Sequence, residues 1–108
     1  MTSFDDRERA FEAKCARDED MAVRIIARRN RLIGEWAAML MGLSEAEAHA
    51  YAKEVIHSDF EEAGDVVVIR KLLGDLTTAQ IDITGEKIRE ALASKTVEAK
   101  RQLMELQS

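Results

Sequence analysis

Residues 4–41 read FDDRERAFEAKCARDEDMAVRIIARRNRLIGEWAAMLM, and this run has two halves of different character. In the first half, eleven of the sixteen residues from Asp5 to Asp20 are charged, with both signs interleaved. Its apolar residues, Phe4, Phe11 and Cys15, recur at helical spacings of seven and four and form one narrow stripe. A segment this charged cannot bury enough apolar surface alone, but it can fold against a partner. Residues 1–20 are therefore predicted to be an N-terminal helical arm.

The second half of the run carries a wider apolar face at helical spacing. Its predicted inward residues are Ala22, Ile25, Ile26, Leu32, Ile33, Trp36, Ala37 and Leu40, with Trp36 as a core anchor. The four consecutive charges of Arg17–Asp20 indicate a junction between arm and core. One straight helix over this run would be about 57 Å long, whereas a domain of this size has a radius of gyration of about 13 Å. The arm is therefore expected to project, fold back or be disordered.

Three further helices are predicted at about 45–62, 66–77 and 85–106, following a first core helix at about 20–41. Gly42 is suited to end the first, Ser44 with Glu47 forms a capping box, and Asp65 and Thr84 are candidate caps for the last two. The β-branched run Val66–Ile69 favours strand, but it has no adequate pairing partner. Short connections predict an all-α, antiparallel four-helix bundle over residues 21–108, with the arm projecting or flexible.

Composition narrows the classes of function. The chain of 108 residues has a net charge of −5, which argues against nucleic acid and in favour of a protein partner. Its single cysteine, Cys15, excludes an intrachain disulfide and fits a reducing compartment. No signal peptide is recognisable, and the longest apolar stretch is far below the roughly 20 residues that span a bilayer. The expected location is the cytoplasm, without membrane insertion, and the free protein is expected to be a monomer.

Few residues suggest site chemistry. Glu54 and His57 have the Glu-x-x-His spacing of di-iron proteins, but a second such motif is absent, so no metal site is expected. Arg24, Arg28, Arg29 and Arg31 form a basic band, which is either a solvated helix face or a docking patch for an acidic partner or nucleotide phosphates. That patch would allow weak ADP or ATP binding, and no other cofactor is expected. No catalytic constellation is present, so the chain is not expected to be an enzyme.

Three segments resemble a known family: FDDRERAFEAKCARDED, ARRNRLIGEWAAMLMGLS (Ala27–Ser44) and AEAHAYAKEVIHSDFEEAGD (Ala46–Asp65). They are similar to the zeta subunit, the ATPase inhibitor of alphaproteobacterial F-type ATP synthases. The detailed match covers about the first two thirds of the chain. Two positions depart from the pattern: Cys15 replaces an expected larger aromatic residue, and Val66–Ile69 replaces a more acidic start to the third helix.

The resemblance implies a four-helix bundle with an inhibitory arm that enters the interface between catalytic and non-catalytic subunits of the ATPase head, beside the rotor. It implies that rotation in the hydrolytic direction stops, and that the protein is peripheral to the inner membrane through the ATP synthase. The arm residues carried over are Phe4, Asp5, Asp6, Arg7, Glu8, Arg9, Phe11, Glu12 and Lys14. Two alternatives remain open, a nucleotide-sensing helical module and a generic helical adaptor for an unrelated protein.

Overall fold

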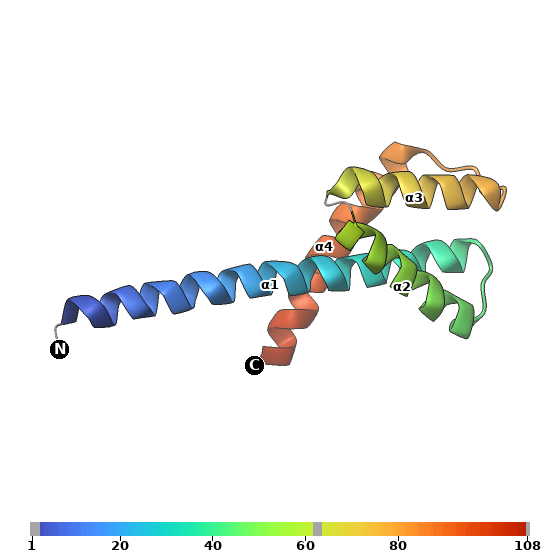
Figure 1. Cartoon of the computed structure of the whole chain (residues 1–108). Helices are drawn as coiled ribbons and strands as arrows, with labels where there is room; N and C mark the ends of the chain where they lie inside the picture. The colour runs from blue at the N-terminus through green and yellow to red at the C-terminus, as the bar shows by residue number, and fades with distance from the viewer. Residues whose placement is uncertain (1–2, 62–63, 108) are drawn as a thin grey trace.

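The computed structural model describes the backbone of residues 3–61 and 64–107, and the side chains of residues 20–59 and 64–106. It contains four helices, α1 Ser3–Leu40, α2 Glu45–Glu61, α3 Asp65–Thr78 and α4 Gly85–Gln107. Helix α2 turns back along the second half of α1, α3 lies beside α2, and α4 crosses α1 (Figure 1). The predicted all-helical, four-helix fold is confirmed, including the region of Val66–Ile69.

The first half of α1 extends well beyond the other three helices (Figure 1). The principal extents of 65 × 27 × 21 Å reflect this projection, since α1 alone has 38 residues. Of the three arrangements expected for the arm, projection is the one found. The backbone continues as helix through Arg17–Asp20, so the junction predicted there is not a break in α1. Just after it, Arg24 pairs with Asp20 at 3.0 Å, one helical turn apart, and supports helix across this charged region.

The ends of the helices follow local capping rules. Gly42, with φ 74°, closes α1 in a Schellman motif: the N–H of Leu43 donates to Ala38 O at 3.0 Å, and the N–H of Gly42 to Met39 O at 3.1 Å. At the start of α2, the Ser44 N–H donates to Glu47 Oε1 at 3.0 Å, and the Glu47 N–H to Ser44 Oγ at 3.2 Å. These two bonds form the predicted capping box.

Later turns were predicted with mixed success. Thr84 caps α4, because its Oγ1 accepts a bond from the Lys87 N–H at 3.2 Å. Asp65 does not cap α3: the cap is Gly64, without a side-chain hydrogen bond, and Asp65 is the first helical residue. Helix α3 ends in a second Schellman motif with Gln80 at φ 65°, a conformation that glycine adopts more readily.

The core lies where the second half of α1 meets the other three helices. Its buried apolar residues are Ile33, Ala37, Ala38, Tyr51, Val55, Val68, Leu72, Leu76, Ile88 and Leu92. Trp36 packs against this cluster as a half-buried side chain, in keeping with its predicted role. Helices α1 and α2 approach each other closely at Gly34, since a Cβ placed on it would lie 2.8 Å from Ala52 Cα.

Several burial predictions were wrong. Ala22 and Ile26 are exposed because the bundle covers only the later turns of α1, and Leu40, in the last turn of that helix, is exposed as well. The helical pattern of residues 85–106 also predicts that Leu106 is inward, but it is exposed near the end of α4. The pattern of residues 66–76 predicts five candidates for burial, Val67, Ile69, Leu72, Leu73 and Leu76. Leu72 and Leu76 are buried, the other three are half-buried, and Val68, which was not a candidate, is buried. The helical pattern of residues 45–62 also predicts that Phe60 is inward, and its side chain lies outside the described part of the structure.

Candidate functional site

The nine predicted arm residues lie on the helical backbone of α1, and their side chains are outside the described part of the structure. They are Phe4, Asp5, Asp6, Arg7, Glu8, Arg9, Phe11, Glu12 and Lys14. On this backbone, positions 4 and 11 are about 10.5 Å apart along the helix axis, or two turns. The fold therefore presents the backbone of the arm as a single helix that extends away from the bundle (Figure 1).

Three arginines of the predicted basic band lie close together at the root of the arm, which we define as residues 20–31. Arg24 pairs with Asp20, Arg28 donates from Nη1 to Gln102 Oε1 at 3.1 Å, and Arg31 lies 3.6 Å from Glu35. Arg24, Arg28 and Arg31 line one groove together with Ala27, Ile56 and Leu103. Each of the three guanidinium groups thus has a polar partner among the described residues.

The fourth arginine of the band is separated from the others. Arg29 is only 6% exposed, and its Nε and Nη2 donate to Asn30 Oδ1 at 3.1 and 3.0 Å. Its Nη1 donates to Asp65 Oδ1 at 2.8 Å, which joins α1 to the first residue of α3. Arg29 precedes the buried Ile33 by four residues and lies on the same face, so helical spacing alone could have indicated its burial.

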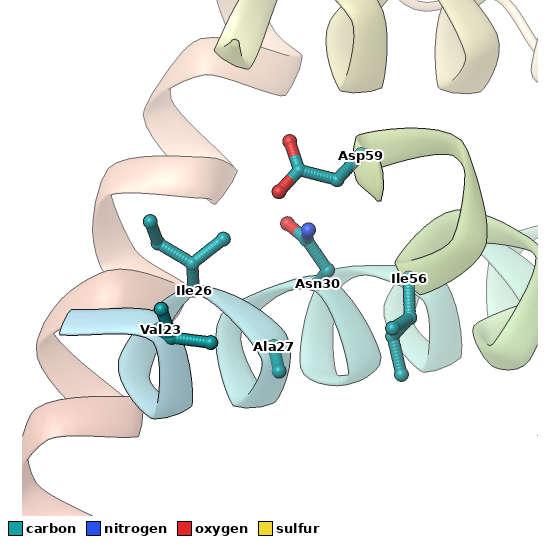
Figure 2. Close-up of a pocket in the computed structure, with 6 residues that line it drawn as sticks. All are labelled: Val23, Ile26, Ala27, Asn30, Ile56 and Asp59. Carbon is teal, nitrogen blue, oxygen red and sulfur yellow. The ribbon is translucent and has the colours of Figure 1, made fainter. Parts of the chain in front are cut away.

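Asn30, which stands within the sequence of the basic band, is 1% exposed and lines a pocket between α1 and α2. Figure 2 shows its amide facing the space below Asp59, with Val23, Ile26, Ala27 and Ile56 around it. Asn30 Nδ2 has no hydrogen-bond partner among the described residues. Most buried donors in proteins are hydrogen-bonded, so Asn30 Nδ2 is an exception among the described side chains.

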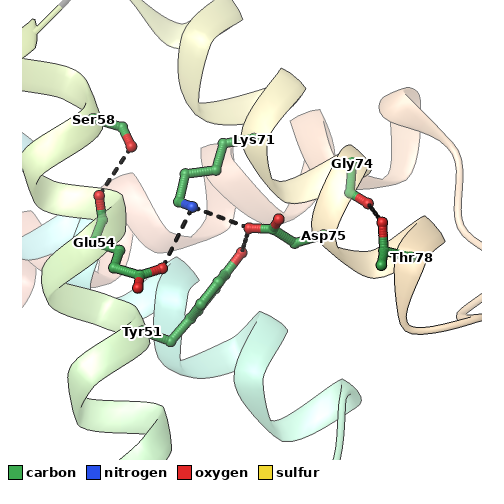
Figure 3. A network of polar contacts seen from close by, with 7 residues as sticks. All are labelled: Tyr51, Glu54, Ser58, Lys71, Gly74, Asp75 and Thr78. Carbon is green, nitrogen blue, oxygen red and sulfur yellow. Dashed lines mark hydrogen bonds and ion pairs between the residues drawn. The ribbon is translucent and has the colours of Figure 1, made fainter.

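A second polar cluster joins α2 to α3 (Figure 3). Tyr51 Oη donates to Asp75 Oδ2 at 2.6 Å, and Lys71 Nζ lies 3.1 Å from the same oxygen and 3.6 Å from Glu54 Oε2. Lys71 Nζ also lies 5.3 Å from the centroid of the Tyr51 ring, within cation–π range. Glu54 therefore takes part in interhelical pairing, and within the described side chains no group of three potential metal ligands gathers anywhere.

This cluster predicts an alkaline limit to stability. Burial, the hydrogen bond to Asp75 and the negative charges of Asp75 and Glu54 all raise the pKa of Tyr51 well above its usual range. Because the pKa of Tyr51 is higher in the folded than in the unfolded protein, the stabilisation that its hydroxyl contributes is complete below the unfolded pKa of about 10. This contribution falls as the pH rises above that value.

We expect Tyr51→Phe to lower the free energy of unfolding at pH 7 by about 1.5 kcal/mol, the lower end of the range for a bond to a charged group. The gap between the wild-type protein and Tyr51→Phe should shrink above pH ~10, where the unfolded tyrosine ionises. Urea unfolding of the wild-type protein and Tyr51→Phe between pH 7 and 11 measures this difference in the free energy of unfolding. Tyr51 is the only tyrosine of the chain, so no other tyrosine ionises over this range. A constant gap across this range would contradict the prediction.

Comparison with known proteins agrees with the resemblance found in the sequence. The family model for ATPase inhibitor subunit zeta matches residues 1–102. A solved protein, determined by solution NMR, is 44% identical with a TM-score of 0.70, over 79% of this chain and 96% of that one. No curated protein matches the chain. Over the residues described, none of the helices is long and apolar enough to cross a membrane.

The family match spans the projecting helix, the buried Arg29–Asn30 pair and nearly all of the bundle. It also shows that the chain is a regulatory protein and not an enzyme, because the members of this family are inhibitors without an enzymatic activity of their own. The chain belongs to the ATPase inhibitor subunit zeta family.

Proposed function

We propose that this protein blocks ATP hydrolysis by an F-type ATP synthase by inserting its N-terminal arm into a catalytic interface of the ATPase head. The observation that carries the proposal is the projection of the first half of α1 from a bundle whose described buried core begins only at Arg29. An amphipathic helix that its own domain leaves uncovered is suited to a groove on another protein. Family membership supplies the class of that partner.

Within the arm, Phe4 and Phe11 are the proposed anchors. Large aromatic side chains contribute much of the energy of protein interfaces when they fill pockets. Arg7, Glu8 and Glu12 set the register through ion pairs with a cleft that carries both signs. Asp5, Asp6, Arg9 and Lys14 complete the proposed contact surface. The cleft lies between catalytic and non-catalytic subunits, beside the rotor, where an inserted helix would stop rotation in the hydrolytic direction.

The bundle, residues 21–108, acts in this proposal as a docking platform. Ordering an arm on its partner costs conformational entropy, and a second contact from the same chain raises the effective concentration of the arm. Arg24, Arg28 and Arg31 are the proposed docking residues for acidic side chains of the head, because they lie in one groove at the root of the arm. Nucleotide phosphates are the second ligand that this groove could take. The proposed location is at the inner membrane, through the ATP synthase.

A hydrolysis assay tests the proposal. The purified protein is added to F-type ATPase that lacks its own inhibitor, and ATP hydrolysis is followed as the inhibitor is titrated. We expect hydrolysis to fall at micromolar concentrations, because the arm occupies an interface that must open and close during turnover. The same titration with heat-unfolded protein serves as a control. Undiminished hydrolysis at these concentrations would refute the inhibitor function.

A further inference from the structure

The groove at the root of the arm gathers positive charge in an acidic protein. Its volume is about 330 Å³, and among the described residues its charged lining consists of Arg24, Arg28 and Arg31, without a carboxylate. The whole chain, by contrast, has a net charge of −5. Seven positions separate the first of these arginines from the last, so the three form a row of about 10.5 Å along α1. A row of this length suits anionic groups that are spread along a binding partner.

The carboxylates that the described part of the chain offers to this row pair with its two ends. Arg24 pairs with Asp20 at 3.0 Å, and Arg31 lies 3.6 Å from Glu35. These four side chains are between 43% and 60% exposed, and ion pairs this exposed contribute little to stability. In the middle of the row, the described partner of Arg28 is a neutral amide oxygen of α4. An incoming carboxylate can therefore pair with Arg28 and exchange with the outer ion pairs.

The floor of the groove is apolar. Ala27 of α1, Ile56 of α2 and Leu103 of α4 form it, and all three are half-buried. Further burial of this surface favours an occupant with an apolar side chain. The described lining includes neither an aromatic ring on which a nucleotide base could stack nor a helix N-terminus that could bind phosphate. These features favour a polypeptide segment that carries both carboxylates and an apolar side chain.

The groove and the proposed anchors of the arm are on different sides of α1. The helix is unbroken from Ser3 to Leu40, so each residue turns about 100° around one axis. Positions 24, 28 and 31 are then about 120–180° around the axis from position 4, whereas position 11 is within about 20° of position 4. The first half of α1 extends along this axis away from the bundle (Figure 1). A partner surface that holds positions 4 and 11 therefore leaves the groove accessible to a different surface.

We propose that the groove of Arg24, Arg28 and Arg31 binds an acidic segment of the ATPase head, separate from the interface that takes the arm. Carboxylates of this segment accept hydrogen bonds from the guanidinium groups, and an apolar side chain of the same segment lies on Ile56 and Leu103. The identity of the partner rests on the proposed function, whereas the chemistry of the occupant rests on the groove. Because exposed charges act mainly on association, docking speeds the encounter, and the inserted arm determines dissociation.

Two full-length variants test the groove. Arg24→Gln combined with Arg31→Gln, the arginine variant, removes the two outer charges and keeps helix-forming side chains. Leu103→Gln makes the floor polar at nearly unchanged size. The matched control for charge is Arg70→Gln combined with Arg89→Gln, since both arginines are exposed and lie outside the groove. Circular dichroism checks folding, and the rates of association with inhibitor-free ATPase and of dissociation are measured at about 0.05 M and about 0.5 M salt.

We expect the arginine variant to associate about 10-fold more slowly than the wild-type protein at the lower salt concentration and to dissociate at the same rate. The difference should shrink at the higher salt concentration, because ions screen exposed charges. Leu103→Gln should raise the half-inhibitory concentration by about 5-fold at both salt concentrations, because salt does not screen an apolar contact. The control should behave as the wild-type protein does.

Wild-type association by the folded arginine variant, or an equal loss in the control, would disprove the docking segment. Wild-type potency of folded Leu103→Gln would disprove the apolar contact and with it the proposed occupant. ADP is also titrated into the isolated proteins, and binding that only the arginine variant loses would assign the groove to nucleotide phosphates instead. If one variant fails to fold, the other decides. Failure of the proposed function is distinguishable, because the wild-type protein itself would then leave hydrolysis unchanged.

Discussion

Deletion of residues 1–19 is expected to abolish inhibition of ATP hydrolysis and to leave the four-helix bundle folded. Every described residue that is buried lies at or beyond Arg29, so the truncation removes no buried side chain of the described core. The hydrolysis assay compares the full-length and truncated proteins, and circular dichroism follows cooperative melting of both. The helical signal should fall in proportion to the helical residues removed, while the melting transition is retained.

A full-length variant separates the side chains of the arm from its length. Phe4→Ala combined with Phe11→Ala should raise the half-inhibitory concentration by at least about 30-fold, equivalent to one strong hot spot of about 2 kcal/mol. The matched control is Met39→Ala with Val66→Ala, which removes two exposed apolar side chains from the bundle.

A protein truncated by residues 1–19 that unfolds would show the arm to be part of the core. Inhibition retained by the truncated protein would place the inhibitory element elsewhere.

The second large effect is expected at Gly34, where α1 crosses α2. A Cβ there would lie 2.8 Å from Ala52 Cα and 3.3 Å from both Ala52 Cβ and Val55 Cγ2. The first of these atoms belongs to the backbone, so the helices must separate rather than a side chain rotate. Gly34→Ala is therefore expected to lower the free energy of unfolding by about 1–3 kcal/mol, the usual range for overpacking, despite its better helix propensity.

Gly74→Ala provides the matched control for the crossing. Gly74 is helical on α3, and a Cβ there would meet nothing within 4 Å. The same substitution should then stabilise the protein by about 0.5–1 kcal/mol, since alanine restricts the unfolded chain and favours helix. Urea unfolding of the wild-type protein and the two variants at one pH measures the change in the free energy of unfolding, which should be negative for Gly34→Ala and positive for Gly74→Ala. Equal stabilisation at both positions would show that the helices are not in close contact at Gly34.

The positions of the helices were predictable because a few adjacent residues determine where each helix begins or ends. The Ser44–Glu47 capping box, the Gly42 turn and the Thr84 cap were read from the sequence and are present. Local hydrogen bonds with a spacing of three or four residues decide such features, so no distant part of the chain is needed. The exception is Asp65, whose carboxylate turns to Arg29 on another helix instead of capping α3.

The candidate sites were predictable only in part. Charge density and family resemblance indicated the arm, whose contacts stay a prediction, while the burial of Asn30 was not expected from the sequence. Arg29 was assigned to a basic surface band with Arg24, Arg28 and Arg31, although its guanidinium is buried against Asn30 and Asp65. The band was read from neighbouring positions in the chain, whereas burial depends on which other helices cover each face of α1.

By itself, the sequence determined the helical class, the helix boundaries and the presence of an arm too charged to form a core. These follow from propensity, capping and the balance of apolar and charged residues within short windows. Tertiary structure alone decided the close approach of α1 and α2 at Gly34, the burial of Arg29, and the burial of Asn30 beside the pocket between these helices. Each of these depends on residues from two helices meeting in space, and no single segment carries that information.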